Sequence, residues 1–100
     1  MTKKITVVAL ETLIAQHNNI HLIDVREEHE YRGGHISGAI NLPLSQLSHK
    51  FEQLDKNKEY YLVCQRGGRS IRACQFLELK GYKVINVDGG TEAWRGNLEV

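Results

Sequence analysis

Short apolar runs recur along the chain, and segments with apolar residues at helical spacing separate them. The runs cover residues 4–7, 21–25, 39–42, 60–63 and 83–87. The run at 21–25 is apolar at consecutive positions, a pattern typical of strands that are covered on both faces, as in parallel sheets. The pattern therefore predicts five short strands.

Helical segments are expected between these runs. Ser45 is a candidate N-cap of one helix, in which Leu47, Phe51 and Leu54 lie on one side. Further helices or helical turns are predicted over 8–16, 27–31, 70–80 (closed by Gly81) and 91–95, with turn or loop at 18–19 and 35–38. Strands that alternate with helices imply crossover connections. We expect an α/β fold, with a five-stranded, mainly parallel sheet flanked by helices on both faces, as one domain over residues 1–100.

Three polar residues follow or end predicted strands. Asp24, Cys64 and Asp88 each fall at the carboxyl end of a run. In parallel sheets, ligands bind outside the carboxyl ends of the strands. The strand pattern therefore predicts a functional site at this edge of the sheet.

The segment from Cys64 to Ser70 is the strongest candidate for chemistry. Its successive N–H groups can form an anion cradle around the thiol, and the helix that follows directs its positive end at the loop. Arg66 and Arg69 add two positive charges. Such surroundings stabilise the thiolate, the form of cysteine that attacks. The alternative is that Cys64 only fills the end of a buried strand, but the clustered arginines, glycines and helix start favour a reactive cysteine.

Composition narrows the function classes. The chain has 100 residues and a net charge of +1, far less basic than a general nucleic-acid binder. No apolar run is long enough for a membrane span or a signal peptide, so we expect a cytoplasmic protein without a membrane partner.

The two cysteines, Cys64 and Cys74, do not make a disulfide framework. We expect Cys74 to pack in the core, and a role for it as a resolving cysteine stays open. The histidines, including His17, lack metal-ligand spacing, and we expect neither metal nor cofactor.

Four segments together resemble the rhodanese family of sulfurtransferases, in the family's order and over about residues 8–96. They are Asp24-Val25-Arg26-Glu27, Gly34-His35-Ile36-Ser37-Gly38-Ala39-Ile40-Asn41-Leu42-Pro43, Cys64-Gln65-Arg66-Gly67-Gly68-Arg69-Ser70, and Gly89-Gly90 followed by Trp94. The family fold is a five-stranded, mostly parallel sheet flanked by helices, in agreement with the strand pattern.

The resemblance implies that Cys64 is a nucleophile that carries sulfur as a persulfide. A small anionic donor such as thiosulfate supplies the sulfur, and cyanide, a thiol or a sulfur-relay protein accepts it in a ping-pong reaction. The residues expected to bind the substrate are Gln65, Arg66, Gly67, Gly68, Arg69 and Ser70. Arg69 is expected to close the loop, whereas Arg66 either favours anionic donors or points to solvent.

Alternatives remain for the function and for neighbouring residues. Related phosphatases have five residues between cysteine and arginine, but four separate Cys64 from Arg69, so we expect sulfur transfer. A persulfide carrier or docking module, and a redox sensor based on Cys64, are the rival functions. Asp24 and Arg26 are expected either to form an ion pair that holds the fold or to support the loop, and His35 is expected to be a hydrogen-bonding loop residue.

Overall fold

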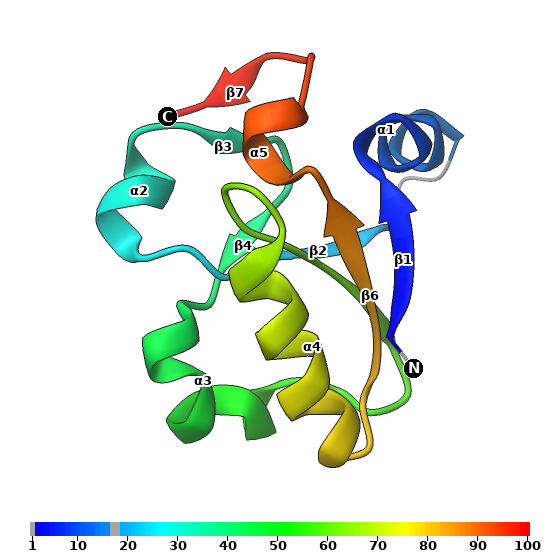
Figure 1. The fold of residues 1–100 in the computed structure, drawn as a ribbon, viewed down its shortest axis with the longest axis vertical. Coiled ribbons are helices and arrows are strands. Elements are labelled where there is room, and N and C mark those ends of the chain that lie inside the picture. Colours follow the sequence, from blue (N-terminus) through cyan, green and yellow to red (C-terminus); the bar gives the residue numbers. More distant parts are fainter. Residues whose placement is uncertain (1, 17–18) are drawn as a thin grey trace.

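The computed structural model describes residues 2–16 and 19–100, and its centre is a five-stranded parallel sheet (Figure 1). The predicted turn residue Asn18, and His17, lie outside the described residues. The strand order is β1-β6-β5-β2-β4, all in parallel pairs. The strands are β1 (Lys3–Thr6), β2 (His21–Asp24), β4 (Ile40–Asn41), β5 (Glu59–Val63) and β6 (Lys83–Asp88). The predicted α/β fold is therefore confirmed.

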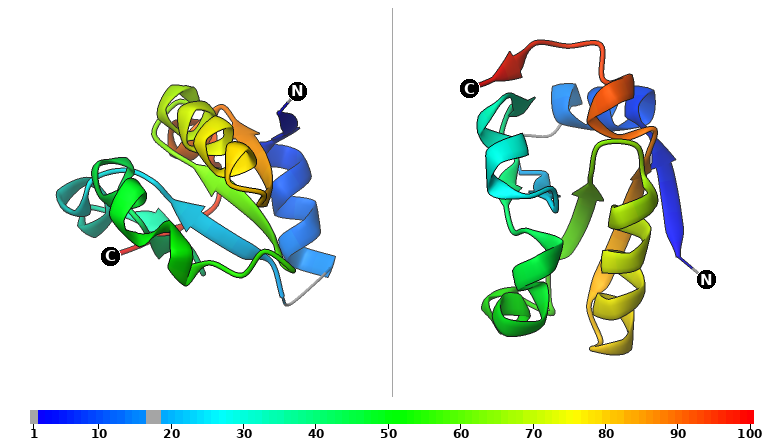
Figure 2. Two further views of the ribbon diagram at one scale, coloured as in Figure 1. Left: turned by 90° about the horizontal axis from the view of Figure 1, so that it is seen from below. Right: turned by 60° about the vertical axis from the view of Figure 1, so that its left-hand side comes forward.

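Helices cover both faces of the sheet (Figure 2). They are α1 (Val7–Gln16), α2 (Glu28–Arg32), α3 (Leu44–Lys50) followed by the 3-10 turn η1 (Phe51–Gln53), α4 (Gly68–Leu79) and α5 (Gly90–Ala93). Helix α1 lies on one face, and α3 and α4 lie on the other. Among the described residues, no helix has the length and apolar character needed to cross a membrane.

Alternation along β5 assigns its side chains to two separate cores. Tyr60, Leu62 and Cys64 join the cluster that α3 and α4 cover, which also contains Cys74 and Leu77. Tyr61 and Val63 join the cluster beneath α1. Because successive side chains of a strand point to opposite faces, the register of β5 determines that Cys64 faces α4.

Two predictions of local structure were wrong. Ser45 is not an N-cap, because α3 begins at Leu44 after Pro43, and the Ser45 hydroxyl instead donates to the Glu27 carboxylate over 2.7 Å. The predicted loop at 35–38 contains strand β3 (His35–Ile36), which pairs antiparallel with β7 (Leu98–Glu99). This pairing joins segments about sixty residues apart, so no local pattern could reveal it.

Several element boundaries also differ by one or two residues from the prediction. Helix α1 starts at Val7 rather than residue 8, and the Ala9 amide donates to the Thr6 hydroxyl over 3.1 Å at this junction. Helix α4 starts at Gly68, two residues before the predicted start. The Cys64 loop is therefore shorter than the sequence indicated, and its last residues already belong to the first turn of a helix.

Candidate functional site

Cys64 directly follows β5 and lies at the base of a cavity of about 530 Å³. The cavity is lined by Cys64, Gln65, Arg66, Gly68, Arg69 and Arg72. The residue itself is only 1% exposed. The cavity therefore gives an incoming molecule a positively charged approach to a buried thiol.

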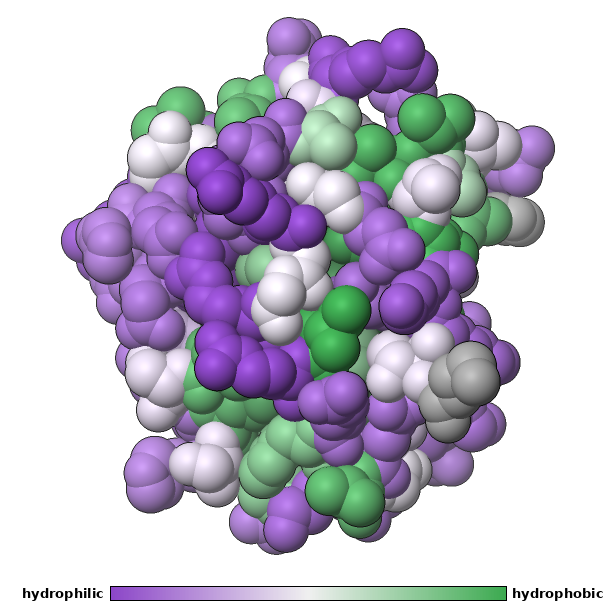
Figure 3. All heavy atoms as spheres, in the orientation of Figure 1, coloured by the Kyte–Doolittle hydropathy of each residue, from purple (hydrophilic) through white to green (hydrophobic). Residues whose placement is uncertain are grey.

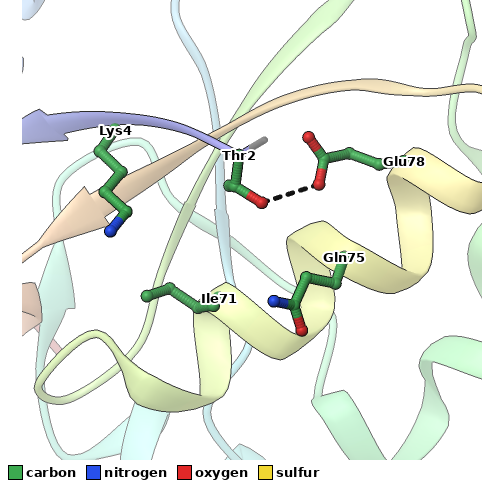
Figure 4. Close-up of a pocket in the computed structure, with 5 residues that line it drawn as sticks. All are labelled: Thr2, Lys4, Ile71, Gln75 and Glu78. Carbon is green, nitrogen blue, oxygen red and sulfur yellow. Dashed lines mark hydrogen bonds between the residues drawn. The ribbon is translucent and has the colours of Figure 1, made fainter.

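Another hollow, of about 650 Å³, lies between β1 and α4 (Figure 4). Its lining includes Thr2, whose hydroxyl donates to the Glu78 carboxylate over 2.8 Å, together with Lys4, Ile71 and Gln75. This hollow is the larger of the two, but it contains neither cysteine. The smaller cavity, which contains the thiol, is the candidate site.

Hydrogen bonds converge on the Cys64 sulfur. The Gly67 amide donates to Sγ over 3.0 Å, and the Ser70 hydroxyl oxygen lies 3.4 Å from it. Gly67 has a φ of +113°, a conformation that suits glycine, and its N–H points to the sulfur. The loop thus forms part of the expected cradle around one sulfur atom.

Burial opposes ionisation of the Cys64 thiol, but the hydrogen bonds outweigh it. The Ser70 hydroxyl and the amides of Ser70, Gly67 and Arg66 together hold the pKa of Cys64 below its ordinary value. For Cys74, by contrast, burial and then the charges of Glu78 and Cys64 raise the pKa to about 12. The two free cysteines therefore differ in chemistry, and Cys74 packs in the core as expected.

Ser70 has one hydroxyl proton and more than one possible acceptor for it. Its hydroxyl can donate to the Gly67 carbonyl oxygen at 3.1 Å and to Oδ1 of Asn86, which lies very close. The Asn86 amide is oriented by donating from Nδ2 to Asp88 over 2.8 Å. When Cys64 is a thiolate, Ser70 must turn this proton from Asn86 or Gly67 to the sulfur. Asn86 therefore competes with the thiolate for the Ser70 proton.

Arg26 and Asp24 form the expected ion pair, and the pair also supports the loop. Arg26 is 4% exposed and donates to Asp24 from Nε and from Nη2, the latter over 2.9 Å. It also donates to the Gly34 carbonyl over 2.7 Å and to Oε1 of Gln65 over 3.2 Å. The Gln65 side chain therefore accepts a hydrogen bond from Arg26, while the Gln65 backbone remains part of the loop around the sulfur.

The arginines of the loop have carboxylate partners that sequence reasoning missed. Arg69 donates to both carboxylate oxygens of Glu30 in α2, over 2.6 and 2.9 Å. The Arg69 hydrogen bond is the main reason that the pKa of Glu30 falls to about 2. Arg66 is largely exposed and lies 3.3 Å from the carboxylate of Glu92. In the structure, Glu27 and Glu30 form a capping box at the start of α2, but nothing local in the sequence indicated the contact from Glu30 to Arg69.

The segment after β6 approaches the loop from the other side. The Thr91 amide donates to the Cys64 carbonyl over 2.8 Å, and the Glu92 amide donates to the Gln65 carbonyl over 3.0 Å. A Cβ added to Gly90 would lie 2.5 Å from both of those carbonyl oxygens. Only glycine fits this approach at position 90.

His35 lies in β3 rather than in a loop, although its side chain forms hydrogen bonds as expected. Its Nδ1 lies 3.0 Å from the Tyr31 carbonyl oxygen, and its ring stacks on the Tyr31 ring with 3.8 Å between centroids. It does not line the Cys64 cavity. Within residues 2–16 and 19–100, no cluster of three or more histidine, cysteine, aspartate or glutamate residues could hold a metal ion.

Comparison with known proteins identifies the family of this chain. The family profile described as "Rhodanese-like domain" matches residues 6–97. YtwF of Bacillus subtilis, provisionally named a sulfurtransferase, is 40% identical over 97% of this chain and 94% of its own length. The thiosulfate sulfurtransferase GlpE of Shewanella oneidensis is 35% identical over 76% of each protein.

Two further relatives bear on fold and role. A rhodanese-like domain protein from Staphylococcus aureus, known from its crystal structure, superposes with a TM-score of 0.92 at 33% identity, over 99% of this chain and 98% of that one. YrkF of Bacillus subtilis, provisionally named a sulfur carrier protein, is 33% identical over 96% of this chain, which spans 52% of its length.

Replacing Ser70 with Ala should raise the pKa of Cys64, because a charge-assisted hydrogen bond to the thiolate is lost. Replacing Asn86 with Leu should lower the pKa, because Ser70 then donates to sulfur without a competitor. The rate of Cys64 alkylation by iodoacetamide, measured against pH, reports both shifts. Since the thiolate is the reactive form, a lowered pKa moves the rise in rate to lower pH.

The double variant decides whether Asn86 acts through Ser70. In the Ser70→Ala background, Asn86→Leu should leave the alkylation profile unchanged. An equal shift in both backgrounds would contradict the competition for the Ser70 proton. Asn86 is fully buried, so its replacement can disturb the packing around it. Circular dichroism of each variant therefore checks that the fold is retained.

Replacing Gly90 with Ala should destabilise the fold by about 2–3 kcal/mol, because its Cβ collides with backbone carbonyls and its φ is positive. Urea unfolding measures the loss. Gly33→Ala is the matched control, since that residue has negative φ and the nearest atom to its added Cβ would be the Glu30 carbonyl oxygen at 3.4 Å. Equal midpoints for the two variants would contradict the tight approach at Gly90.

Proposed function

The chain belongs to the family of rhodanese-like domains, and on that basis we propose that it transfers sulfane sulfur through a persulfide on Cys64. The observation that carries the proposal is the Cys64 sulfur itself. It lies at the base of an arginine-lined cavity, and hydrogen bonds lower its pKa despite burial. A stabilised thiolate with an open approach is suited to attack a sulfur donor.

In the first half-reaction, the Cys64 thiolate attacks the outer sulfur of thiosulfate. A bond forms between Sγ and that sulfur, while its bond to the sulfonate group breaks and the electron pair leaves as sulfite. In the second, an acceptor such as cyanide attacks the terminal sulfur, and the electron pair of the Sγ–S bond returns to Cys64. No external oxidant or reductant is needed.

The loop residues have distinct proposed roles in this reaction. The amides from Gln65 to Ser70 hold the anionic sulfur or the sulfonate, with the Gly67 amide already in contact with Sγ. Gly68 begins α4 and lines the cavity, where a Cβ added to it would meet nothing within 4 Å. Arg69 fixes the loop to Glu30, and its charge also faces Cys64. Arg66 is exposed at the mouth, where it can attract an anionic donor.

A second candidate is a persulfide carrier, which the relative YrkF favours by its name. A carrier receives sulfur from a protein partner and shows little turnover of free thiosulfate. The chemistry at Cys64 would be the same in both cases. Steady-state kinetics distinguish the two, since an enzyme shows saturable turnover with thiosulfate and cyanide.

Brief exposure to thiosulfate should add the mass of one sulfur atom to the protein, and cyanide should remove it. Intact-protein mass spectrometry measures the change, and Cys64→Ser should show none. Cys74→Ala is the matched control and should gain sulfur normally, because that thiol stays protonated in the core. A gain that persists in Cys64→Ser would contradict the proposal. Its absence in all variants at millimolar donor would exclude thiosulfate as the donor and favour the carrier, which a protein partner loads.

Phosphatase activity should be negligible, because the loop has four residues between Cys64 and Arg69 and encloses a single sulfur atom. Hydrolysis of an aryl phosphate by the wild type should not exceed that of Cys64→Ser. Cysteine-dependent turnover of the phosphate would show that the loop accepts a tetrahedral oxyanion.

A further inference from the structure

Three arginines spaced three residues apart surround the opening above Cys64. Arg66, Arg69 and Arg72 all line the same cavity. Arg72 lies one helical turn after Arg69 on α4, so both point from the same side of that helix. On the molecular face that bears the loop, strongly hydrophilic side chains gather over α2, the loop and the start of α4 (Figure 3).

Two of these arginines already have carboxylate partners. Arg69 is paired with Glu30, and Arg66 is close to Glu92. Arg72 forms neither a hydrogen bond nor an ion pair with any residue in the described ranges 2–16 and 19–100. Arg72 is therefore the uncommitted positive charge of the cavity, available to an anion that enters it.

The cavity is also larger than a small inorganic donor requires. Its volume of about 530 Å³ falls in the range of pockets that hold drug-sized organic ligands, roughly 300–1,000 Å³. The sulfur lies at the buried end, whereas Arg72 is exposed. A molecule whose thiol reaches Cys64 would thus extend outward past Arg72.

We propose that Arg72 binds a carboxylate of a low-molecular-weight acidic thiol, which is the sulfur acceptor of this site. The inference rests on the proposed function, since the acceptor must meet a Cys64 persulfide. It adds a substrate class and a residue that determines specificity. Arg66 and Arg69 contribute less to this recognition, because Glu92 and Glu30 already neutralise much of their charge.

The transfer step is balanced without another reactant. The acceptor thiolate attacks the terminal sulfur of the Cys64 persulfide and forms a new S–S bond. The bond between that sulfur and Sγ breaks, and its electron pair returns to Cys64 as thiolate. The product is the persulfide of the acidic thiol, and its carboxylate stays with Arg72 until release.

The test compares two acceptors on protein that is first loaded with thiosulfate. Mercaptosuccinate carries two carboxylates, and thioglycerol is a neutral thiol of similar size. Loss of the extra sulfur is followed by rapid quench and intact mass. For Arg72→Gln, the second-order rate constant with mercaptosuccinate should fall about three- to tenfold, as expected for a partly solvated charge contact. The rate with thioglycerol should not change.

Each thiol is compared only with itself across variants, so differences in intrinsic thiol reactivity cancel. Lys83→Gln is the matched control, because it removes one charge at the start of β6, the end of the sheet opposite Cys64. It should leave both rates unchanged. Added salt should slow the mercaptosuccinate reaction of the wild type and should affect Arg72→Gln less.

A second measurement does not depend on sulfur transfer. Succinate has the carboxylates of mercaptosuccinate but no thiol, and it should slow alkylation of Cys64 in the wild type more than in Arg72→Gln. Absence of sulfur loading would count against thiosulfate as the donor in the proposed function, whereas the succinate result would still decide the Arg72 site. Equal protection of both proteins, or an equal fall in rate with both thiols, would overturn the inference.

Discussion

A single buried guanidinium group joins the segments on which the site is built. Arg26 contacts the Asp24 carboxylate at the end of β2, the Gly34 carbonyl before β3 and the Gln65 side chain in the loop. Removing one partner of a buried ion pair commonly costs about 3–5 kcal/mol, because the other charge is left uncompensated. The position of the Cys64 loop therefore depends on a charge that does not line the Cys64 cavity.

The loop is held from several sides, and this support explains how a buried sulfur can be ionised. Backbone amides of α5 bind the carbonyls of Cys64 and Gln65, and Glu30 fixes Arg69 from α2. With these positions fixed, the loop amides face Sγ without having to reorganise, which is the condition under which such dipoles stabilise an anion most. The hydrogen bonds thereby outweigh the cost of burial at Cys64, while the unsupported thiol of Cys74 keeps a high pKa.

Local patterns in the sequence were sufficient for the sheet and for the place of the thiol. Apolar runs identified the strands, and the position of Cys64 after such a run placed it at the carboxyl edge. Contacts between distant segments could not be predicted in this way. The β3–β7 pair, the Glu30–Arg69 pair and the Asn86 contact to Ser70 join residues 16 to about 60 positions apart. Ser45 was misassigned as an N-cap because its helix already begins at Leu44, directly after Pro43. The Leu44 amide donates a hydrogen bond to the Val25 carbonyl oxygen at this start.

The strand order has a consequence for motion at the site. Strand β5 is the middle strand, with β6 on one side and β2 on the other, whereas β1 and β4 form the edges. Fraying begins at edges and termini, and the interior of a sheet opens only at a free energy near that of global unfolding. Amide hydrogens of β5 should consequently exchange among the slowest in the chain. The thiol is therefore attached to the part of the molecule least affected by local fluctuations, and adaptation to different substrates falls to the side chains around the mouth.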